Sequence, residues 1–375
     1  MIIILIEDNY THIHTLNKGT ILLKDLQIGD LVYTQNLDYQ PVINITKQKY
    51  KNNIYTLYLQ NALPLNITED QEILTIPLYV KKHYNQYPIS KFYQTYTKEN
   101  YNNATRYARD FELFWLKANQ LQNKDCPVTP ISFNYQEQPV IDTIFNIPIN
   151  REFLIFLGYV YTFAEIEDKK CIFFIHKAFS SIKSWIRKYI KNTFNINLAL
   201  NTTVMFSKLS TTNKDFISMI QDFFNHGLLS SIKNLPPKEQ LYIFKGLFST
   251  QRNTPSLTIN TNNLTLLYNL LEILQRNYFN PDITIVKEQY RILIRRNNYL
   301  DFNAFLFQNE KNDKLYKTSI TNFTGIQFPI LYNNIYYMNY PLRIYKIYQP
   351  DKPVTAIKID IQNNIPIKIN SILLK

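Results

Sequence analysis

The sequence is poor in cysteine and has no long hydrophobic run at its start. Its two cysteines, Cys126 and Cys171, are too few for a disulfide framework or a cysteine-rich zinc site, so we expect a reducing, intracellular compartment. The apolar start, Met1–Ile6, is followed at once by Glu7 and Asp8. This run is too short for a signal peptide or a membrane-spanning helix, and it predicts a first strand and no membrane span.

Glycine is also scarce, with six in 375 residues. Gly158 and Gly246 occupy equivalent places in two matching segments, Arg151–Glu165 and Pro237–Gln251, each with apolar and aromatic residues on both sides. Glycine inside a helix costs about 1 kcal/mol relative to alanine. Close contact between the two helices would compensate, so we predict that both glycines are helix-packing residues. Ordinary core helices with accidental glycines stay open as the alternative.

Hydrophobic residues and positive charge are plentiful. A hydrophobic content of 45% is enough for a sizeable core. Lys and Arg number 41 against 29 Asp and Glu, and the net charge of +12 favours a polyanionic partner, nucleic acid before an anionic membrane surface. Drift toward lysine codons in an AT-rich genome would raise the charge too, and the 29 tyrosines fit such drift. Charge alone therefore does not decide the partner.

Short strands are predicted near both ends of the chain. Apolar runs and a turn at Gly29–Asp30 indicate strands throughout residues 1–75. Residues 76–110 are a polar, tyrosine-rich insertion, whose bases and aromatics suit nucleic acid, with a solvated helical excursion as the alternative. Further strands are predicted near Trp115–Pro130, Ala356–Ile361 and Ile372–Lys375.

The middle of the chain alternates helices and strands in two similar units. After the Gly158 helix the pattern predicts a strand at Lys169–Ile175, a helix at Phe179–Asn192, a strand pair in Asn195–Ser207 and a helix at Lys214–Asn225. After the Gly246 helix it predicts a strand at Ser256–Asn260, a helix at Asn263–Asn277 and a hairpin of Ile283–Val286 with Tyr290–Arg295, closed by Asp301–Phe307. The spacing of about 88 residues indicates an internal duplication.

The ends of the chain resemble the Hint fold of inteins and hedgehog-type autoprocessing domains. The resemblance rests on the stretch from Gly19 to Val32, with its Gly-Thr, Asp-Leu and Gly-Asp-x-Val pairs, and on Thr68–Gln71 in the place of a Thr-x-x-His box. It implies one β-rich domain built from residues 1–135 and 325–375. Self-splicing needs a thiol or hydroxyl nucleophile and an assisting imidazole. Here the nucleophile's place falls near Glu7, Gln71 replaces the histidine, and the terminal His-Asn pair is absent, so we expect no splicing.

Residues 145–310 resemble the LAGLIDADG homing endonucleases, a type often inserted in a Hint domain. The specific stretches are Leu235–Phe248 and Tyr290–Phe302, together with the order of a Hint half, a doubled helix-strand unit and a second Hint half. The resemblance implies an α+β protein in which two signature helices pack through small residues and saddle-shaped sheets lie along DNA. Each signature helix of that family ends in an acid that binds a divalent metal.

The metal-binding acids are missing from this sequence. Alignment places Phe163 at the first acidic position and Gln251 at the second. Hydrolysis with two metals needs hard anionic oxygen ligands. We therefore expect no catalytic residue, metal site or cofactor, while Glu165 and Glu167 offer a shifted geometry.

Basic residues near the expected binding surface are the candidates for nucleic-acid contact. They fall beside the strands, on one face of the Phe179–Asn192 helix and at the end of the Gly246 helix: Lys169, Lys170, Lys183, Arg187, Lys188, Arg252, Lys287, Arg295 and Arg296. Lys and Arg contact phosphates, and Arg also reads guanine edges. Solvated strand edges protected by charge are the alternative.

These observations predict a catalytically inactive, intein-derived protein that binds nucleic acid, either DNA or a structured, rRNA-like RNA. Membership of a large ribonucleoprotein such as an organellar ribosome fits the composition, and the mitochondrial matrix, a viral particle or the nucleus are the corresponding places. Two alternatives stay open. One is an active, divergent DNA endonuclease that uses Glu165 or Glu167, and the other is a structural subunit of a large viral or organellar assembly.

Overall fold

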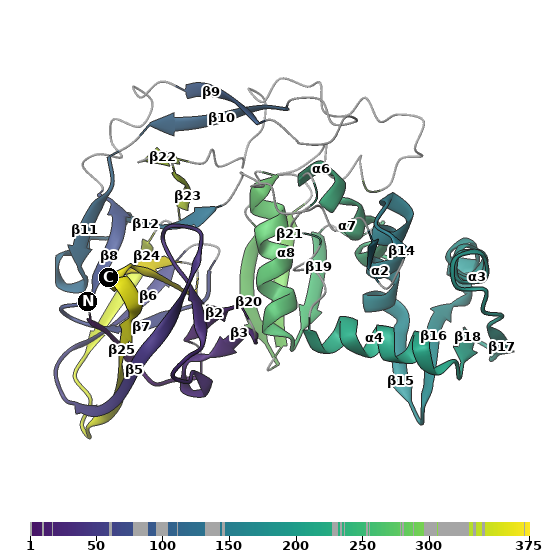
Figure 1. Ribbon diagram of the computed structural model, residues 1–375, viewed down its shortest axis with the longest axis horizontal. Helices are drawn as coiled ribbons and strands as arrows, with labels where there is room; N and C mark the ends of the chain where they lie inside the picture. Colours follow the sequence, from purple (N-terminus) through teal and green to yellow (C-terminus); the bar gives the residue numbers. More distant parts are fainter. Residues whose placement is uncertain are drawn as a thin grey trace. The chain divides into compact units, whose positions relative to one another are not determined.

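The computed structural model covers the 375 residues and divides them into two compact units (Figure 1). Unit 1 comprises residues 1–136, 274–292 and 326–375, and unit 2 comprises residues 137–273 and 293–325. The structure describes all residues except 1, 10, 17, 60–61, 78–88, 95–103, 111, 132–142, 145–146, 227–231, 233–234, 236, 253, 255, 278, 280, 288, 296–305, 307–329, 333–334, 340–341 and 371. The predicted α+β class is confirmed, with a large antiparallel sheet from both chain ends and an α/β region between them.

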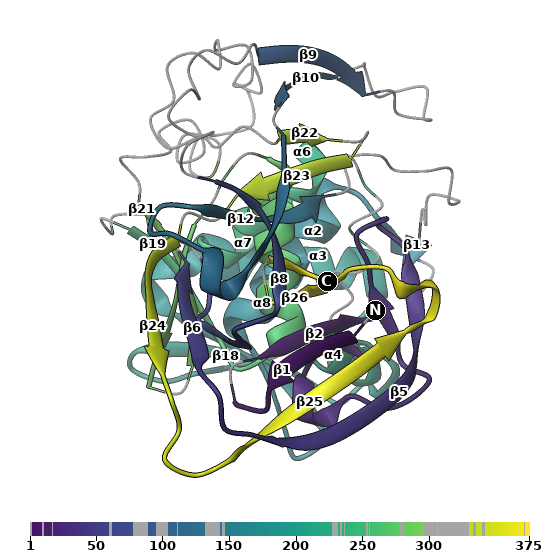
Figure 2. The ribbon, with the colours of Figure 1, turned by 90° about the vertical axis from the view of Figure 1, so that its left-hand side faces the viewer.

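Strands from the two ends of the chain interleave in unit 1. β1 (Ile2–Ile6) pairs antiparallel with β25 (Val354–Ile361), which pairs in turn with β5 (Tyr39–Tyr50). Figure 2 shows these three strands side by side. β27 (Ile372–Leu374) reaches β8 (Glu72–Ile76) through Leu374 and Ile73. The predicted β-rich domain from both ends is therefore present as a single sheet system.

The other strands of unit 1 complete this sheet around an aliphatic core. They are β2 (His12–Thr15), β3 (Gly19–Leu22), β4 (Leu31–Tyr33), β6 (Ile54–Leu59), β7 (Leu65–Thr68), β11 (Phe114–Lys117), β12 (Cys126–Ile131), β22 (Ile330–Tyr332), β23 (Ile335–Asn339), β24 (Leu342–Tyr348) and β26 (Ile367–Ile369). Leu5, Ile67 and Ile359 are among the fully buried side chains of the core. The predicted turn contains Gly29, whose φ of +89° is a conformation that favours glycine.

The described part of residues 76–110 forms strands and not the helix that the sequence left open as the alternative. The described part forms β9 (Ile89–Gln94) and β10 (Ala104–Asp110), which pair antiparallel with each other, and β10 runs parallel to β22. A helical excursion is therefore wrong for residues 89–94 and 104–110, the part of this stretch that the structure describes as strands. Pairing of the two strands provides hydrogen-bond partners for their backbone N–H and C=O groups.

Unit 2 contains the first copy of the helix-strand unit. It runs α2 (Arg151–Phe163), β15 (Ala164–Glu167), β16 (Lys170–His176), α3 (Ser180–Phe194), β17 (Ala199–Thr202), β18 (Phe206–Thr211) and α4 (Lys214–His226), with a sheet order of β15-β16-β18-β17. The short pair β13 (Thr143–Ile144) and β14 (Ile147–Pro148) precedes it. Asp168 and Lys169 both have positive φ angles, as a tight hairpin turn requires. The apolar spacing of Ile182, Ile186 and Ile190 buries one side of α3.

The second copy repeats this order. It runs α6 (Pro237–Gln240), α7 (Tyr242–Leu247), β19 (Ser256–Thr261), α8 (Leu264–Arg276), β20 (Asp282–Val286) and β21 (Gln289–Arg295), with a sheet order of β19-β21-β20. This order matches β16-β18-β17 of the first copy, as the predicted duplication requires, whereas β15 has no counterpart among the described strands of the second copy. Asp301–Phe307 lies outside the described residues except for Leu306. Among the described residues, no helix is long and apolar enough to cross a membrane.

Candidate nucleic-acid interface

Helices α2 and α7 meet at the two glycines that the sequence singled out. A Cβ on Gly158 would lie 2.7 Å from Gly246 Cα and would overlap the carbonyl oxygen of Ile243. A Cβ on Gly246 would lie 2.7 Å from Gly158 Cα and would overlap the carbonyl oxygen of Ile155. These contacts are reciprocal, as expected for two copies related by an approximate two-fold axis. Only glycine allows the two backbones to approach this closely.

The start of α2 also contacts the second copy, through α6, the short helix just before α7. Arg151 donates from Nε and Nη2 to the Glu239 carboxylate at 3.1 and 3.2 Å. The Arg151 guanidinium also lies 4.9 Å from the centre of the Tyr242 ring. Arg151 and Glu239 are 88 residues apart, the same separation as Gly158 and Gly246. The duplication therefore aligns the whole helix pair from its start to its close contact.

The ends of these helices carry no carboxylate at the aligned positions. Phe163 is buried, with 8% of its surface exposed, and packs against Tyr159 at 6.0 Å between ring centres. Gln251 donates from Nε2 to the Thr258 carbonyl and accepts from the Thr258 amide, both at 2.7 Å. These bonds connect the segment just after α7 to β19. The two positions now contribute to packing and to backbone pairing.

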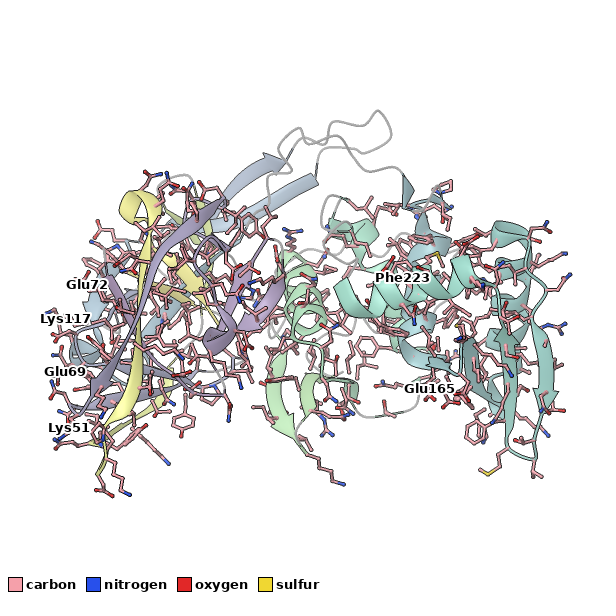
Figure 3. All side chains as sticks on the ribbon, turned by 60° about the horizontal axis from the view of Figure 1, so that its bottom comes forward. Lys51, Glu69, Glu72, Lys117, Glu165 and Phe223 are labelled. Atoms are coloured by element: carbon pink, nitrogen blue, oxygen red, sulfur yellow. The ribbon has the colours of Figure 1, made fainter. Side chains whose placement is uncertain are left out.

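Gln71 has a similar structural role in unit 1. Its Oε1 accepts from the Ile4 amide at 3.0 Å, and its Nε2 donates to the Lys375 carbonyl at 2.7 Å. The neutral amide therefore joins strands from the two chain ends. Glu7, near which the sequence places the nucleophile, pairs instead with Lys47 at 2.8 Å. The charged neighbours Glu69, Glu72 and Lys117 lie along one margin of the unit (Figure 3).

The strand register of the first copy defines an open sheet face. Directly opposed residues point to the same side of an antiparallel sheet. One face carries Cys171, Phe173 and Ile175 with Ser207 and Leu209, all buried, and the helices cover it. The other face carries exposed or half-buried side chains from all four strands: Glu165, Glu167, Lys170, Ile172, Phe174, His176, Ala199, Asn201, Phe206, Lys208 and Ser210.

Charge on this open face is balanced. The two acids, Glu165 and Glu167, stand on the edge strand β15, and the two lysines, Lys170 and Lys208, stand on the inner strands. In Figure 3, Glu165 lies on the strands, whereas Phe223 belongs to α4 and is buried. The saddle-shaped sheet that the resemblance implies is therefore not lined by basic residues alone in this copy.

Positive charge gathers instead in one continuous segment. Residues 169–214 contain no Asp or Glu and nine Lys or Arg: Lys169, Lys170, Lys177, Lys183, Arg187, Lys188, Lys191, Lys208 and Lys214. Subtracting these nine from 41 leaves 32 basic against 29 acidic residues in the rest of the chain. We call residues 169–214 the basic segment. It supplies nine of the twelve units of net charge.

The cations of the basic segment are accessible and unneutralised. All nine are exposed or half-buried, and none forms an ion pair with any residue that the structure describes. Lys183, Arg187 and Lys191 follow one another at every fourth residue of α3, so they form a row about 12 Å long beside Lys188. In this row Arg187 and Lys191 are exposed and Lys183 is half-buried.

The remaining predicted contact residues are spread over other elements. Arg252 is exposed after α7, and Lys287 is exposed in the turn between β20 and β21 with a φ of 50°. Arg295 ends β21, its side chain lying outside the described residues, as does the whole of Arg296. Lys177, Lys191, Lys208 and Lys214 were missing from the predicted set. The absence of acids between Asp168 and Asp215 is the sequence signal that identifies them.

The described residues contain no group of three or more His, Cys, Asp or Glu side chains that could hold a metal ion. Both cysteines are buried, and burial raises the pKa of the Cys171 thiol to about 12.

Comparison with solved structures gives a distant likeness of fold. I-DmoI, in complex with DNA and manganese, is 13% identical with a TM-score of 0.34, over 42% of this chain and 97% of that chain. Full-length DUF199/WhiA from Thermatoga maritima is 16% identical with a TM-score of 0.30, over 49% and 63% of the two chains. The N-terminal LAGLIDADG domain of DUF199/WhiA is 18% identical with a TM-score of 0.29, over 44% and 89%.

No protein-family model and no curated protein matches this sequence. Similarity to known proteins is therefore seen in structure alone. Over about 42% of its length, the chain is similar in fold to a LAGLIDADG homing endonuclease.

Proposed function

We propose that this protein binds nucleic acid through its basic segment and does not cleave it. The observation that carries the proposal is the acid-free run of residues 169–214, with nine accessible cations that have no ionic partner among the described residues. Lysine and arginine side chains in this state displace counterions from phosphates, the main sequence-independent source of affinity for nucleic acid. The row on α3 is the densest part of this surface.

The absence of cleavage follows from the chemistry of the helix ends. Phosphodiester hydrolysis with divalent metals needs anionic oxygen ligands. Phe163 is buried in the core, and the amide of Gln251 is bound to the Thr258 backbone. Neither side chain supplies such a ligand. The protein therefore retains phosphate contacts without a metal to activate water.

We extend the proposal to origin and setting. Unit 1 is a Hint remnant, supported by the interleaving of both chain ends and by Gln71 at their junction. The region from α2 to β21, which lies between the two parts of the Hint remnant in the sequence, is the remnant of an inserted LAGLIDADG nuclease, supported by the reciprocal glycine contact. A large ribonucleoprotein is the setting that fits an inert, basic scaffold, with DNA or structured RNA as the bound polymer.

A divergent endonuclease is the second candidate, and one observation favours it. Glu165 and Glu167 are exposed on β15, directly after the end of α2, where they could each offer an oxygen to a cation. Incubation with supercoiled plasmid and Mg²⁺ tests this candidate. Nicking that Glu165→Gln abolishes would establish it, whereas intact plasmid at all protein concentrations supports a binding protein.

Charge reversal tests the main proposal. Arg187→Glu, Lys188→Glu and Lys191→Glu are combined in one variant, and Lys49→Glu, Lys51→Glu and Lys352→Glu, three exposed lysines of unit 1, form a control with the same change of net charge. We expect the α3 variant to weaken binding of a labelled 20-base-pair duplex at least about ten-fold, and the control to change it far less. Equal effects, or no binding by the wild-type protein, would contradict the proposal and favour a protein-interaction subunit.

A further inference from the structure

The open face of the first sheet carries aromatic rings at its centre. His176 and Phe206 are a directly opposed pair on β16 and β18, with ring centres 5.5 Å apart and planes at 89°. Phe174 and Lys208 form the next pair on the same face, and the Lys208 ammonium lies 4.9 Å from the centre of the Phe174 ring. The two pairs are about 7 Å apart along the strands.

These rings are accessible, and apolar neighbours extend the surface beyond them. Phe206 is 40% exposed, and Met205 and Val204 in the adjoining turn are 57% and 90% exposed. Lys177 follows His176 and is exposed as well. Opposed aromatic pairs stabilise a sheet even without a ligand. That structural role accounts for the ring contacts but not for the exposed extension or for the unneutralised cations at its margin.

The chemistry of this face differs from that of a duplex-reading surface. The bidentate readers of base edges in a duplex groove are above all Arg, Asn and Gln side chains, and the described open face carries one of these, Asn201, besides Lys170 and Lys208. Rings on an open sheet beside cations suit bases that are not paired, because every base has a face that can stack on an aromatic side chain. Phosphates of the same strand can then reach the lysines.

We propose that this open face binds a single strand of nucleic acid, with bases stacked on Phe206, His176 and Phe174 and phosphates near Lys177 and Lys208. This inference rests on the proposed function and names the form of nucleic acid that it takes. The acids of β15 repel phosphate from that edge, so the strand crosses β16, β18 and β17. The positive charge of the basic segment supplies the complementarity to a polyanion.

His176 adds a donor to this surface. Its Nδ1 accepts a hydrogen bond from the Ala178 amide at 3.2 Å, so the ring proton resides on Nε2. Nε2 is then available to donate to a base or phosphate oxygen. Together the face offers stacking rings, the imidazole donor of His176 and the two cations Lys177 and Lys208.

Substitution of Phe206 by two side chains separates stacking from simple apolar contact. Phe206→Leu keeps an apolar group without a ring, and Phe206→Trp restores a ring. Leu200→Ala is the matched control, because Leu200 is 44% exposed on the same sheet but opposes the buried Leu209 on the other face. Binding of a labelled 12-nucleotide DNA strand and of the corresponding 12-base-pair duplex is measured by anisotropy, after circular dichroism shows that each variant is folded.

We expect Phe206→Leu to weaken single-strand binding about ten-fold and duplex binding less than about two-fold. Phe206→Trp is expected to retain single-strand affinity, with tryptophan emission quenched on binding, and Leu200→Ala to leave both affinities unchanged. If Phe206→Leu leaves single-strand binding unchanged, or weakens binding of both forms equally, the open face is not a stacking surface. A protein partner is then the better candidate for the occupant of this face. Binding that still responds to the α3 charge reversal would then leave the proposed function intact, whereas no binding at all would remove both.

Discussion

Several lysines in unit 1 pair with acids, whereas the cations in the basic segment of unit 2 do not pair with any described acid. In unit 1, Lys18 pairs with Asp30 at 2.7 Å and Lys47 with Glu7 at 2.8 Å, and Lys117 reaches Asp70 at 3.2 Å. In residues 169–214 no cation has an ionic partner among the described residues. Codon drift would spread lysine over the whole chain without removing the acids from one stretch of it. The difference therefore points to a local requirement for positive charge.

The two glutamines that stand at catalytic positions of the resembled families, Gln71 and Gln251, have the same structural role. Gln71 bonds the backbones of Ile4 and Lys375, and Gln251 bonds the backbone of Thr258. In each case an amide takes hydrogen bonds that hold neighbouring strands or helices. The comparison thus distinguishes residues that stabilise the fold, such as Gln71 and Gln251, from the cations that we propose contact nucleic acid. The following changes test that distinction.

Gly158→Ala is expected to have the largest effect. Its Cβ would overlap the backbone of α7, which cannot move aside as a side chain can, so we expect unit 2 to lose about 3 kcal/mol or more of unfolding free energy. Urea denaturation measures the loss. Ser184→Ala on the exposed side of α3 is the control and should stay within about 0.5 kcal/mol of wild type. A loss below about 1 kcal/mol would contradict the close contact.

Acid is expected to weaken unit 1 through His12. Burial lowers the pKa of this imidazole from 6.5 to about 4, so the unfolded state binds a proton more readily between these values. The unfolding free energy should therefore fall as the pH drops, by about 2 kcal/mol between pH 7 and pH 5. His12→Gln removes the titration, and the difference between wild type and variant in urea midpoints at the two pH values isolates it. Equal pH dependence of both proteins would contradict the prediction.

Gln71→Ala should destabilise unit 1 by about 1 to 2 kcal/mol, because it removes the partners of the Ile4 amide and the Lys375 carbonyl. Gln48→Ala, an exposed change on β5, is the comparison and should have little effect. Binding of nucleic acid by the Gln71 variant should match wild type. Weaker binding at unchanged stability would place Gln71 in the interface instead.

Neutralising the acidic edge should have the smallest effect. Glu165→Gln with Glu167→Gln removes two charges from β15 beside the open face. Exposed charges interact by a few tenths of a kcal/mol to about 1 kcal/mol, so we expect single-strand affinity to rise about three-fold at low salt. Anisotropy titrations at 50 and 200 mM salt measure it. A loss of affinity would indicate that the acids contribute directly, as the endonuclease candidate requires.

Local elements could be predicted from the sequence, whereas contacts between distant strands could not. The helix at Phe179–Asn192 and the strand at Lys169–Ile175 follow from apolar periodicity, which depends only on neighbouring residues. The twelve residues of β5 lack clear alternation, and their pairing with β25 joins parts of the chain more than 300 residues apart. The role of Gln71 depends on that long-range pairing and so could not be read from its neighbours.

The proposed interface shares only part of its residues with the set predicted from the sequence. Lys169, Lys183 and Arg187 lie in the basic segment, but Arg252 and Lys287 were chosen by alignment with a family and lie on other elements. The run without acids needs no structure to be recognised. The aromatic centre of the open face does need it, because strand register decides that Phe174, His176 and Phe206 share one side.

The salt dependence of binding is the most direct test of the central claim that residues 169–214 contact phosphate. The logarithm of the association constant for a duplex is measured against the logarithm of salt concentration, for wild type and for the α3 charge-reversal variant. We predict a linear fall for wild type and a slope smaller by about 2 to 3 for the variant, since each lost phosphate contact removes about 0.9. Binding that does not respond to salt, or equal slopes for the two proteins, would contradict the claim.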